Sequence, residues 1–149
     1  MKTRTFIFIL ILILTVLVIA GSCATRKIAI SDEELSNAYV GAWINPDATY
    51  YQKFEFLSDR KWQEYYRLVS DSVSEYGEHT IIDQWKDKDG NIFFESKFKT
   101  VRSGVSGFFL VKTNNSENTL EMLIEYGEYR IETWDPDSVF AYRIYYRQE

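Results

Sequence analysis

The stretch Ser31–Ile44, SDEELSNAYVGAWI, decides the fold. It opens on Ser31 with Glu34 three residues later, which is the capping-box pattern that starts a helix. After that helix, Trp43 stands in a segment where apolar residues begin to recur at every second position, as in a half-buried strand. The stretch therefore predicts one short helix over Asp32–Tyr39 that leads directly into the first strand of a sheet.

Downstream of this stretch, the period of two continues to the end of the chain. Clusters of turn-forming residues interrupt it at Ser58–Arg60, Asp87–Gly90, Arg102–Gly104 and Asn114–Asn118. The strands expected between these turns are Tyr50–Phe56, Trp62–Leu68, His79–Lys86, Asn91–Val101, Phe108–Lys112, Leu120–Tyr126, Tyr129–Trp134 and Val139–Arg147.

The pattern predicts an all-β fold. A sheet of eight or nine strands exposes unpaired edges unless it closes into a barrel or folds into a sandwich. The connections are short and sequential, which favours an up-and-down meander over a Greek key. We therefore expect an antiparallel up-and-down barrel of about eight strands, preceded by one short helix.

Two motifs resemble those of a known class of barrels. Gly41-Ala42-Trp43 resembles the G-x-W signature of lipocalin-like (calycin-type) domains, and Phe54–Asp59 is similar to an aromatic strand and turn in small bacterial members. The resemblance implies that Trp43 plugs the closed end of the barrel. It also implies that an arginine of the last strand covers the ring by a cation–π contact, with Arg147 the first candidate and Arg143 the second. The alternative is a core tryptophan in another β-sandwich.

The start of the chain resembles a bacterial lipoprotein signal peptide. A basic beginning is followed by an apolar run over residues 6–20, interrupted at Thr15, and small residues precede Cys23, the only cysteine. The resemblance implies cleavage before Cys23 and its acylation with palmitate-type chains. Each buried CH₂ contributes about 0.8 kcal/mol, so two or more chains hold a protein stably on a bilayer. A plain secretory signal and a membrane-spanning anchor are the alternatives, although spanning needs about 20 apolar residues.

This interpretation divides the chain into a signal peptide (1–22), a lipidated tether (23–30) and one barrel domain (31–149). Removing the signal removes two positive charges and moves the formal net charge from -5 to -7. An acidic domain repels nucleic-acid backbones, so we expect no nucleic-acid partner. The expected location is the bacterial cell envelope, with a lipid anchor in the outer membrane, because Ala24 replaces the aspartate that signals inner-membrane retention.

The sequence shows no pattern of catalytic residues. His79 is the only histidine, which excludes multi-histidine metal sites, and its place between Glu78 and Thr80 predicts an exposed side chain. The acidic residues gather at helix starts and turns, where capping explains them. No phosphate-binding loop or serine elbow is visible. We therefore expect neither an enzyme nor a cofactor or metal.

Besides an enzyme, which the sequence does not favour, two classes of function remain. In the first, the membrane-anchored barrel binds a small apolar or amphipathic ligand. In the second, the barrel is filled, and its outer aromatic surface binds another envelope protein. The charged side chains of successive strands are expected to face water, so the more apolar face points inward. The charged set is Glu95, Lys97, Lys99, Glu121 and Glu125, and the candidate ligand-binding residues are Trp62, Tyr66, Phe94, Phe98, Met122, Ile124 and Tyr142.

Overall fold

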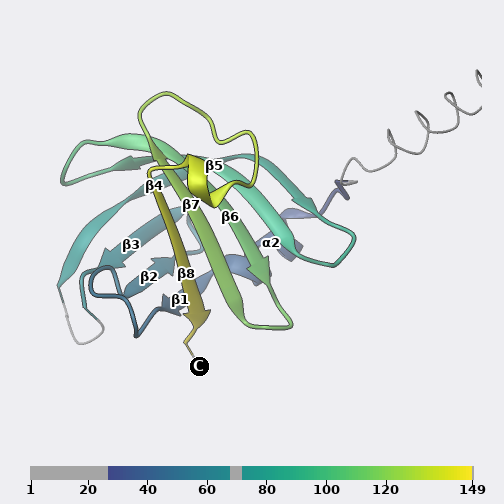
Figure 1. Cartoon of the computed structure of the whole chain (residues 1–149), viewed down its shortest axis with the longest axis horizontal. Helices are drawn as coiled ribbons and strands as arrows, with labels where there is room; N and C mark the ends of the chain where they lie inside the picture. Colours follow the sequence, from purple (N-terminus) through teal and green to yellow (C-terminus); the bar gives the residue numbers. More distant parts are fainter. Residues whose placement is uncertain (1–26, 68–71, 149) are drawn as a thin grey trace, which may run out of the picture.

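A computed structural model describes residues 27–67 and 72–148. The elements, in chain order, are α2 (Asp32–Tyr39), β1 (Gly41–Ile44), β2 (Lys53–Phe56), β3 (Lys61–Tyr65), β4 (Val73–Lys86), β5 (Ile92–Thr100), β6 (Ser106–Asn114), β7 (Thr119–Tyr126), the 3₁₀ turn η1 (Pro136–Ser138) and β8 (Ala141–Arg147). Each strand pairs antiparallel with the next, and β8 pairs with β1, so the sheet closes into an eight-stranded up-and-down barrel (Figure 1). The predicted fold class is confirmed.

The helix forms where the capping pattern predicts it. The Ser31 hydroxyl accepts a hydrogen bond from the Glu34 amide at 3.0 Å, which satisfies one of the free donors of the first turn. The Glu34 carboxylate binds Lys86 Nζ at 2.6 Å and so ties the helix to β4. The inner face of the helix buries Leu35 and Tyr39 against the barrel. This helix therefore closes one end of the barrel.

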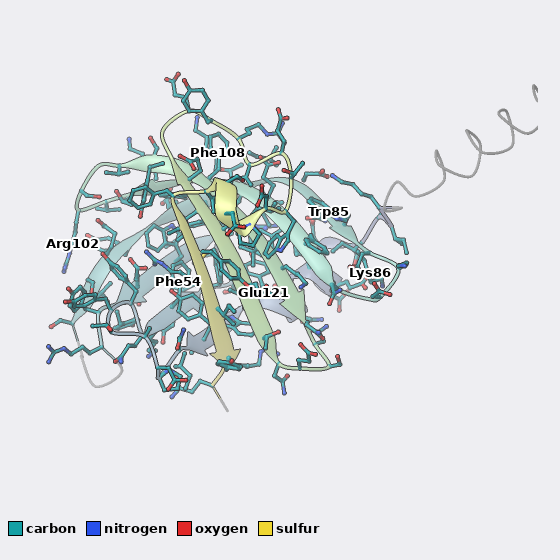
Figure 2. All side chains as sticks on the ribbon, viewed as in Figure 1. Phe54, Trp85, Lys86, Arg102, Phe108 and Glu121 are labelled. Carbon is teal, nitrogen blue, oxygen red and sulfur yellow. The ribbon has the colours of Figure 1, made fainter. Side chains whose placement is uncertain are left out.

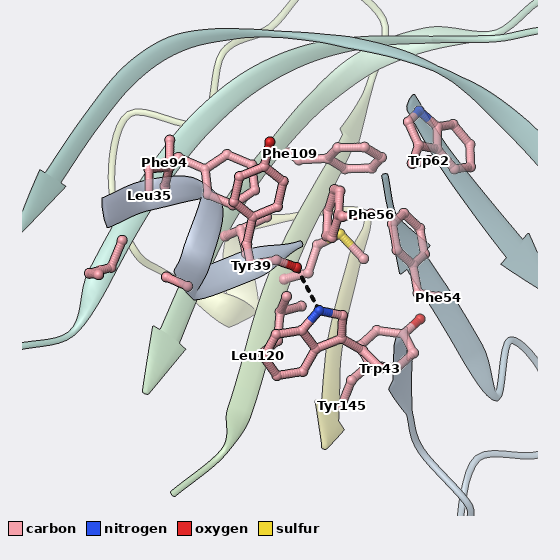
Figure 3. Close-up of a cluster of buried hydrophobic side chains, with 14 of the residues drawn as sticks. Leu35, Tyr39, Trp43, Phe54, Phe56, Trp62, Phe94, Phe109, Leu120 and Tyr145 are labelled. Atoms are coloured by element: carbon pink, nitrogen blue, oxygen red, sulfur yellow. Dashed lines mark hydrogen bonds between the residues drawn. The ribbon is translucent and has the colours of Figure 1, made fainter. Parts of the chain in front are cut away.

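Successive strands run in opposite directions, so their connections fall alternately at the two ends of the barrel, and the two halves differ. The turns after β2, β4 and β6 lie at the same end as α2, and β1, β3, β5 and β7 end at the other, open end (Figure 1). The closed half is packed with rings and aliphatic side chains (Figure 3). Phe56, Phe94 and Leu120 have no exposed surface there. Dense packing of this kind supplies the stability that a domain without a disulfide needs.

One expected strand is absent. The segment 127–140, where the alternation predicted a strand over Tyr129–Trp134, is a loop that ends in η1. It lies over the outer face of β6 and β7, where Phe108, Leu110 and Leu123 form a second apolar cluster with Ile131. Because β6 is apolar on both faces, its outer face also has to be covered. The apolar residues of the segment therefore cover this outer face and do not extend the sheet.

The same loop changes the environment of Glu95. The sequence predicted this outward side chain to meet water, but it is 4% exposed. Arg130 of the loop reaches it with two hydrogen bonds, one from Nε to Oε1 at 2.7 Å and one from Nη2 to Oε2. The prediction for Glu95 is therefore wrong, because a bidentate arginine compensates the buried carboxylate.

The described part of the predicted tether lies on the barrel. Ile28 and Lys86 exchange two backbone hydrogen bonds of 2.8 Å, and Gln84 Nε2 donates to the Ile30 carbonyl at 3.3 Å. Lys27 Nζ binds Asp83 at 2.8 Å and stands 3.7 Å above the centre of the Trp85 ring. The chain therefore reaches the domain at the closed end of β4. The predicted signal peptide and Cys23 lie outside the described residues.

Candidate ligand cavity at the open end

The open half of the barrel contains a cavity of about 530 Å³. This size falls within the range of sites that take small organic ligands. Its floor is apolar and consists of Phe54, Trp62, Phe98, Phe109 and Ile124, and its upper wall is polar, with Glu64, Glu75, Tyr126 and Arg143 among the residues that line it. Figure 2 shows Arg102 at this open end and Lys86 at the opposite end of the barrel.

The aromatic floor is held by ring-to-ring packing. Phe98 and Phe109 stack with centroids 4.2 Å apart, and Trp62 stacks on Phe54 at 5.4 Å. Gly107 lies opposite Phe98 on β6, where a Cβ atom would stand 2.9 Å from the Phe98 ring and 2.1 Å from a backbone oxygen of β7. A residue without a side chain is needed there, because it lets the Phe98 ring lie flat across the strand.

The polar wall centres on an ion pair inside the barrel. Arg143 Nη1, on β8, donates to Glu64 Oε1, on β3, and the two side chains are 16% and 10% exposed. Arg143 also lies over the Tyr51 ring, 4.3 Å from its centre. Burial raises the pKa of Glu64, and the Arg143 charge opposes that effect. Burial also raises the pKa of Tyr145, next to this pair, to about 12.

The mouth of the cavity is fixed by hydrogen bonds. Glu75 accepts from the backbone amides of Arg102 and Ser103, both at 3.1 Å. Burial acts to raise the pKa of Glu75, but these bonds and one from the Ser103 side chain hold it below its usual range. Thr100 Oγ1 accepts from the Val105 amide at 2.8 Å. The loop between β5 and β6 is therefore tied to β4 at the rim.

The structure brings four of the seven predicted ligand-binding residues to the cavity, namely Trp62, Tyr66, Phe98 and Ile124. Phe94 and Met122 also face inward, but both are fully buried in the solid core of the closed half.

The predicted place of Tyr142 is wrong. It pairs with Leu123 on β7, whose side chain belongs to the outer cluster, so both side chains lie outside the barrel. The Tyr142 hydroxyl donates to the Glu121 carboxylate, and its ring contacts Trp134. The more apolar face of β8 points outward, because the inward face carries Arg143, whose charge Glu64 compensates.

The sequence analysis did not predict the polar residues that line the cavity, chiefly Glu64, Glu75 and Tyr51. For Glu64 a signal existed, because it stands midway between Trp62 and Tyr66 on the same face of its strand. The signal was missed because charged side chains were expected on the outer face of the barrel. Tyr51 and Glu75 carry no such signal, since the loops that place them follow no period.

At the closed end, Trp43 takes the position that the G-x-W resemblance implies for a plug. It is 1% exposed, and its indole N–H donates to the Tyr39 carbonyl at 2.7 Å (Figure 3). The Arg147 guanidinium lies 4.8 Å from the ring centre and donates to the carbonyls of Asn37 and Ala38. Gly41 starts this strand with a φ of 134°, in the region that favours glycine.

His79 is buried, contrary to the predicted surface position. It is 3% exposed and packs against the rings of Tyr39, Phe56 and Phe94. Burial lowers the pKa of His79 to about 4, and the nearby Arg60 charge adds to the effect. The long strand β4 starts at Val73, six residues before the expected start, so His79 falls in its middle and turns inward.

Residues 27–67 and 72–148 contain neither a metal-binding cluster nor a membrane-spanning helix. Over these ranges, no group of three or more histidine, cysteine, aspartate or glutamate side chains is placed to hold a metal ion. In the same part of the chain, no helix has the length and apolar character needed to cross a bilayer.

Comparison with known proteins identifies no relative. No model of a protein family matches the chain, and no curated protein and no solved structure matches it significantly.

Proposed function

We propose that this protein binds a small apolar or amphipathic ligand in the cavity of the open half. The observation that carries the proposal is the contrast between the two halves of the barrel. In the barrel interior, the closed half is filled by buried side chains, whereas the open half leaves about 530 Å³. The hollow of about 570 Å³ at the closed end lies between α2 and β4 and is lined mainly by polar residues. A barrel of this size has enough large side chains to fill its interior. The open half is lined by aromatic rings and yet is not filled, and this feature supports ligand binding.

The residues that line the cavity favour an amphipathic ligand. Trp62, Phe98 and Ile124 supply apolar contact deep in the cavity, while Glu64 and Arg143 supply hydrogen-bonding groups on one wall. A ligand with an apolar body and one polar group matches both surfaces, since unpaired polar groups are costly to bury.

Binding of apolar fluorescent probes and fatty compounds to the full chain in lipid nanodiscs tests the proposal, with empty nanodiscs as the blank. We expect saturable binding that Phe98→Arg abolishes, because the long charged side chain fills the floor of the cavity. Tyr142→Arg is the matched control and should bind as the wild type does, since Tyr142 lies outside the barrel. Circular dichroism checks that both variants are folded. Absence of saturable binding by any probe would refute the proposal.

We propose further that an acylated Cys23 anchors the barrel in the bacterial envelope, at the outer membrane. The support is the signal-like sequence that ends at Cys23. Labelled palmitate should enter the wild-type protein and not the Cys23→Ser variant. A Cys23→Ser protein that stays with membranes after alkaline washing would place the anchor elsewhere.

A second candidate function is contact with another envelope protein. Two large side chains of the outer loop (residues 127–140) favour it, because Tyr129 is 80% exposed and Phe140 is 70% exposed. Cross-linking in cells from a photoreactive residue at position 129 tests this candidate. A discrete protein adduct, together with no binding of the apolar probes, would support protein contact at this surface and not ligand binding in the cavity.

A further inference from the structure

The ion pair between Glu64 and Arg143 influences which ligands the cavity accepts. We propose that the cavity selects amphiphiles whose head group is uncharged and carries both a hydrogen-bond donor and an acceptor, such as a primary amide, over carboxylates and amines with the same chain. The inference rests on the proposed ligand-binding function and names the class of ligand.

Glu64 and Arg143 are placed to receive such a head group. They come from β3 and β8, both line the cavity, and both keep some accessible surface. The hydrogen bond between them joins one guanidinium nitrogen to one carboxylate oxygen. A guanidinium has five N–H donors and a carboxylate about four acceptor positions, so each retains capacity for a ligand.

A charged head group would disturb the balance of this pair. A carboxylate that approaches Arg143 also approaches the Glu64 carboxylate, and an amine that approaches Glu64 meets the Arg143 charge. Burying a charge without a free partner is unfavourable in general. An amide avoids this cost, because its N–H group donates to Glu64 while its carbonyl accepts from Arg143.

The other charged group of the wall does not supply a free partner. Glu75 lies at the mouth, where the backbone amides of Tyr76, Arg102 and Ser103 and the Ser103 side chain together take up the roughly four acceptor positions of its carboxylate. The phenol of Tyr126, also on the wall, is neutral, and burial raises its pKa. The selectivity therefore depends on Glu64 and Arg143.

Isothermal titration calorimetry with decanamide, decanoate and decylamine separates the head groups at constant chain length. The full chain is used in nanodiscs of uncharged lipid, with the heat of empty nanodiscs subtracted. We expect the wild type to bind decanamide about tenfold or more tightly than either charged compound. This ranking needs no variant.

Two variants then assign the selectivity to the pair. Glu64→Gln leaves Arg143 uncompensated, so decanoate should gain about tenfold in affinity; Arg143→Gln should favour decylamine in the same way. Glu121→Gln is the control, because it removes one partner of the Lys112–Glu121 ion pair on the outer face and should leave the ranking unchanged.

The outcomes separate the inference from the proposed function. Equal or tighter binding of decanoate or decylamine by the wild type overturns the selectivity alone, and so does a shift that Glu121→Gln reproduces. If none of the three compounds and no apolar probe binds, the cavity function itself is overturned and the inference with it.

Discussion

At the scale of single residues, Trp43 connects three parts of the closed end. Its indole N–H binds the last turn of α2, its ring fills the end of the barrel, and Arg147 of β8 covers it. Trp43 therefore joins the helix to both strands at the point of barrel closure. The stability of the closed end is therefore concentrated at this residue.

Replacing Trp43 by alanine should lower the free energy of unfolding by about 3–5 kcal/mol, because it opens a large cavity and leaves a carbonyl of α2 without its donor. Trp43→Phe keeps much of the packing and should cost less. Denaturant titration followed by circular dichroism measures both. A loss below about 1 kcal/mol for Trp43→Ala would show that the ring is not a structural plug.

His79 should make the stability depend on pH. Its pKa is about 4 in the folded state, against 6.5 for an exposed histidine, so between these values the unfolded chain binds a proton that the folded chain does not. The stabilisation is complete above pH 6.5 and is lost as the pH falls towards 4. Between about pH 7.5 and 5 the loss attributable to His79 should be about 2 kcal/mol.

The variant His79→Phe isolates this effect, since it fills the same aromatic site and does not titrate. Its stability should fall less than that of the wild type over the same pH interval. Parallel curves for the two proteins would mean that His79 is protonated equally in both states and is not buried as described.

At the scale of elements, the outer loop 127–140 contributes to the fold without being a strand. Ile131 is 7% exposed and packs with Phe108, Leu110 and Leu123. Ile131→Ala should lower the free energy of unfolding by about 2 kcal/mol. Tyr129→Ala, two residues away and 80% exposed, should change it by less than about 0.5 kcal/mol. Equal effects of the two substitutions in urea titrations would contradict the docking of this loop.

The elements also show how far the sequence predicts this structure. The helix bounds, its cap and the order of the hairpins follow from local patterns, and the structure agrees. The inward face of β7 follows from its alternation as well. The face of β8 does not, because its orientation depends on Glu64, about 80 residues earlier in the chain. The alternation within β8 carries no information about a residue so far away in the sequence. For the same reason, the polar wall of the cavity was not predicted.

At the scale of the whole molecule, the cavity and the start of the described chain lie at opposite ends of the barrel. Lys27 and Ile28 are held on the closed end of β4 by Asp83, Trp85 and Lys86. The four steps from Lys27 back to Cys23 span at most about 14 Å. With the proposed anchor at Cys23, the closed end should lie near the membrane and the mouth should point away from it.

This orientation can be measured with fluorophores attached at Lys88→Cys and Arg102→Cys in the acylated protein on vesicles. Lys88 lies in the turn after β4, at the closed end, and Arg102 lies at the mouth. Quenchers placed in the lipid head groups should reduce the emission of the label at position 88 more strongly. Stronger quenching at position 102 would mean that the mouth faces the membrane.

The central claim is that the open half of the barrel holds a ligand, and the tryptophans of the chain provide its most direct test. The four lie in three settings: Trp62 lines the cavity, Trp43 closes the opposite end, and Trp85 and Trp134 both pack on the outer cluster. Each gives a separate indole N–H signal in a nitrogen–proton NMR spectrum. Titration with decanamide should shift the Trp62 signal saturably and leave the other three in place. A saturable shift of Trp85 or Trp134 without one of Trp62, or no saturable shift at all, would contradict the claim.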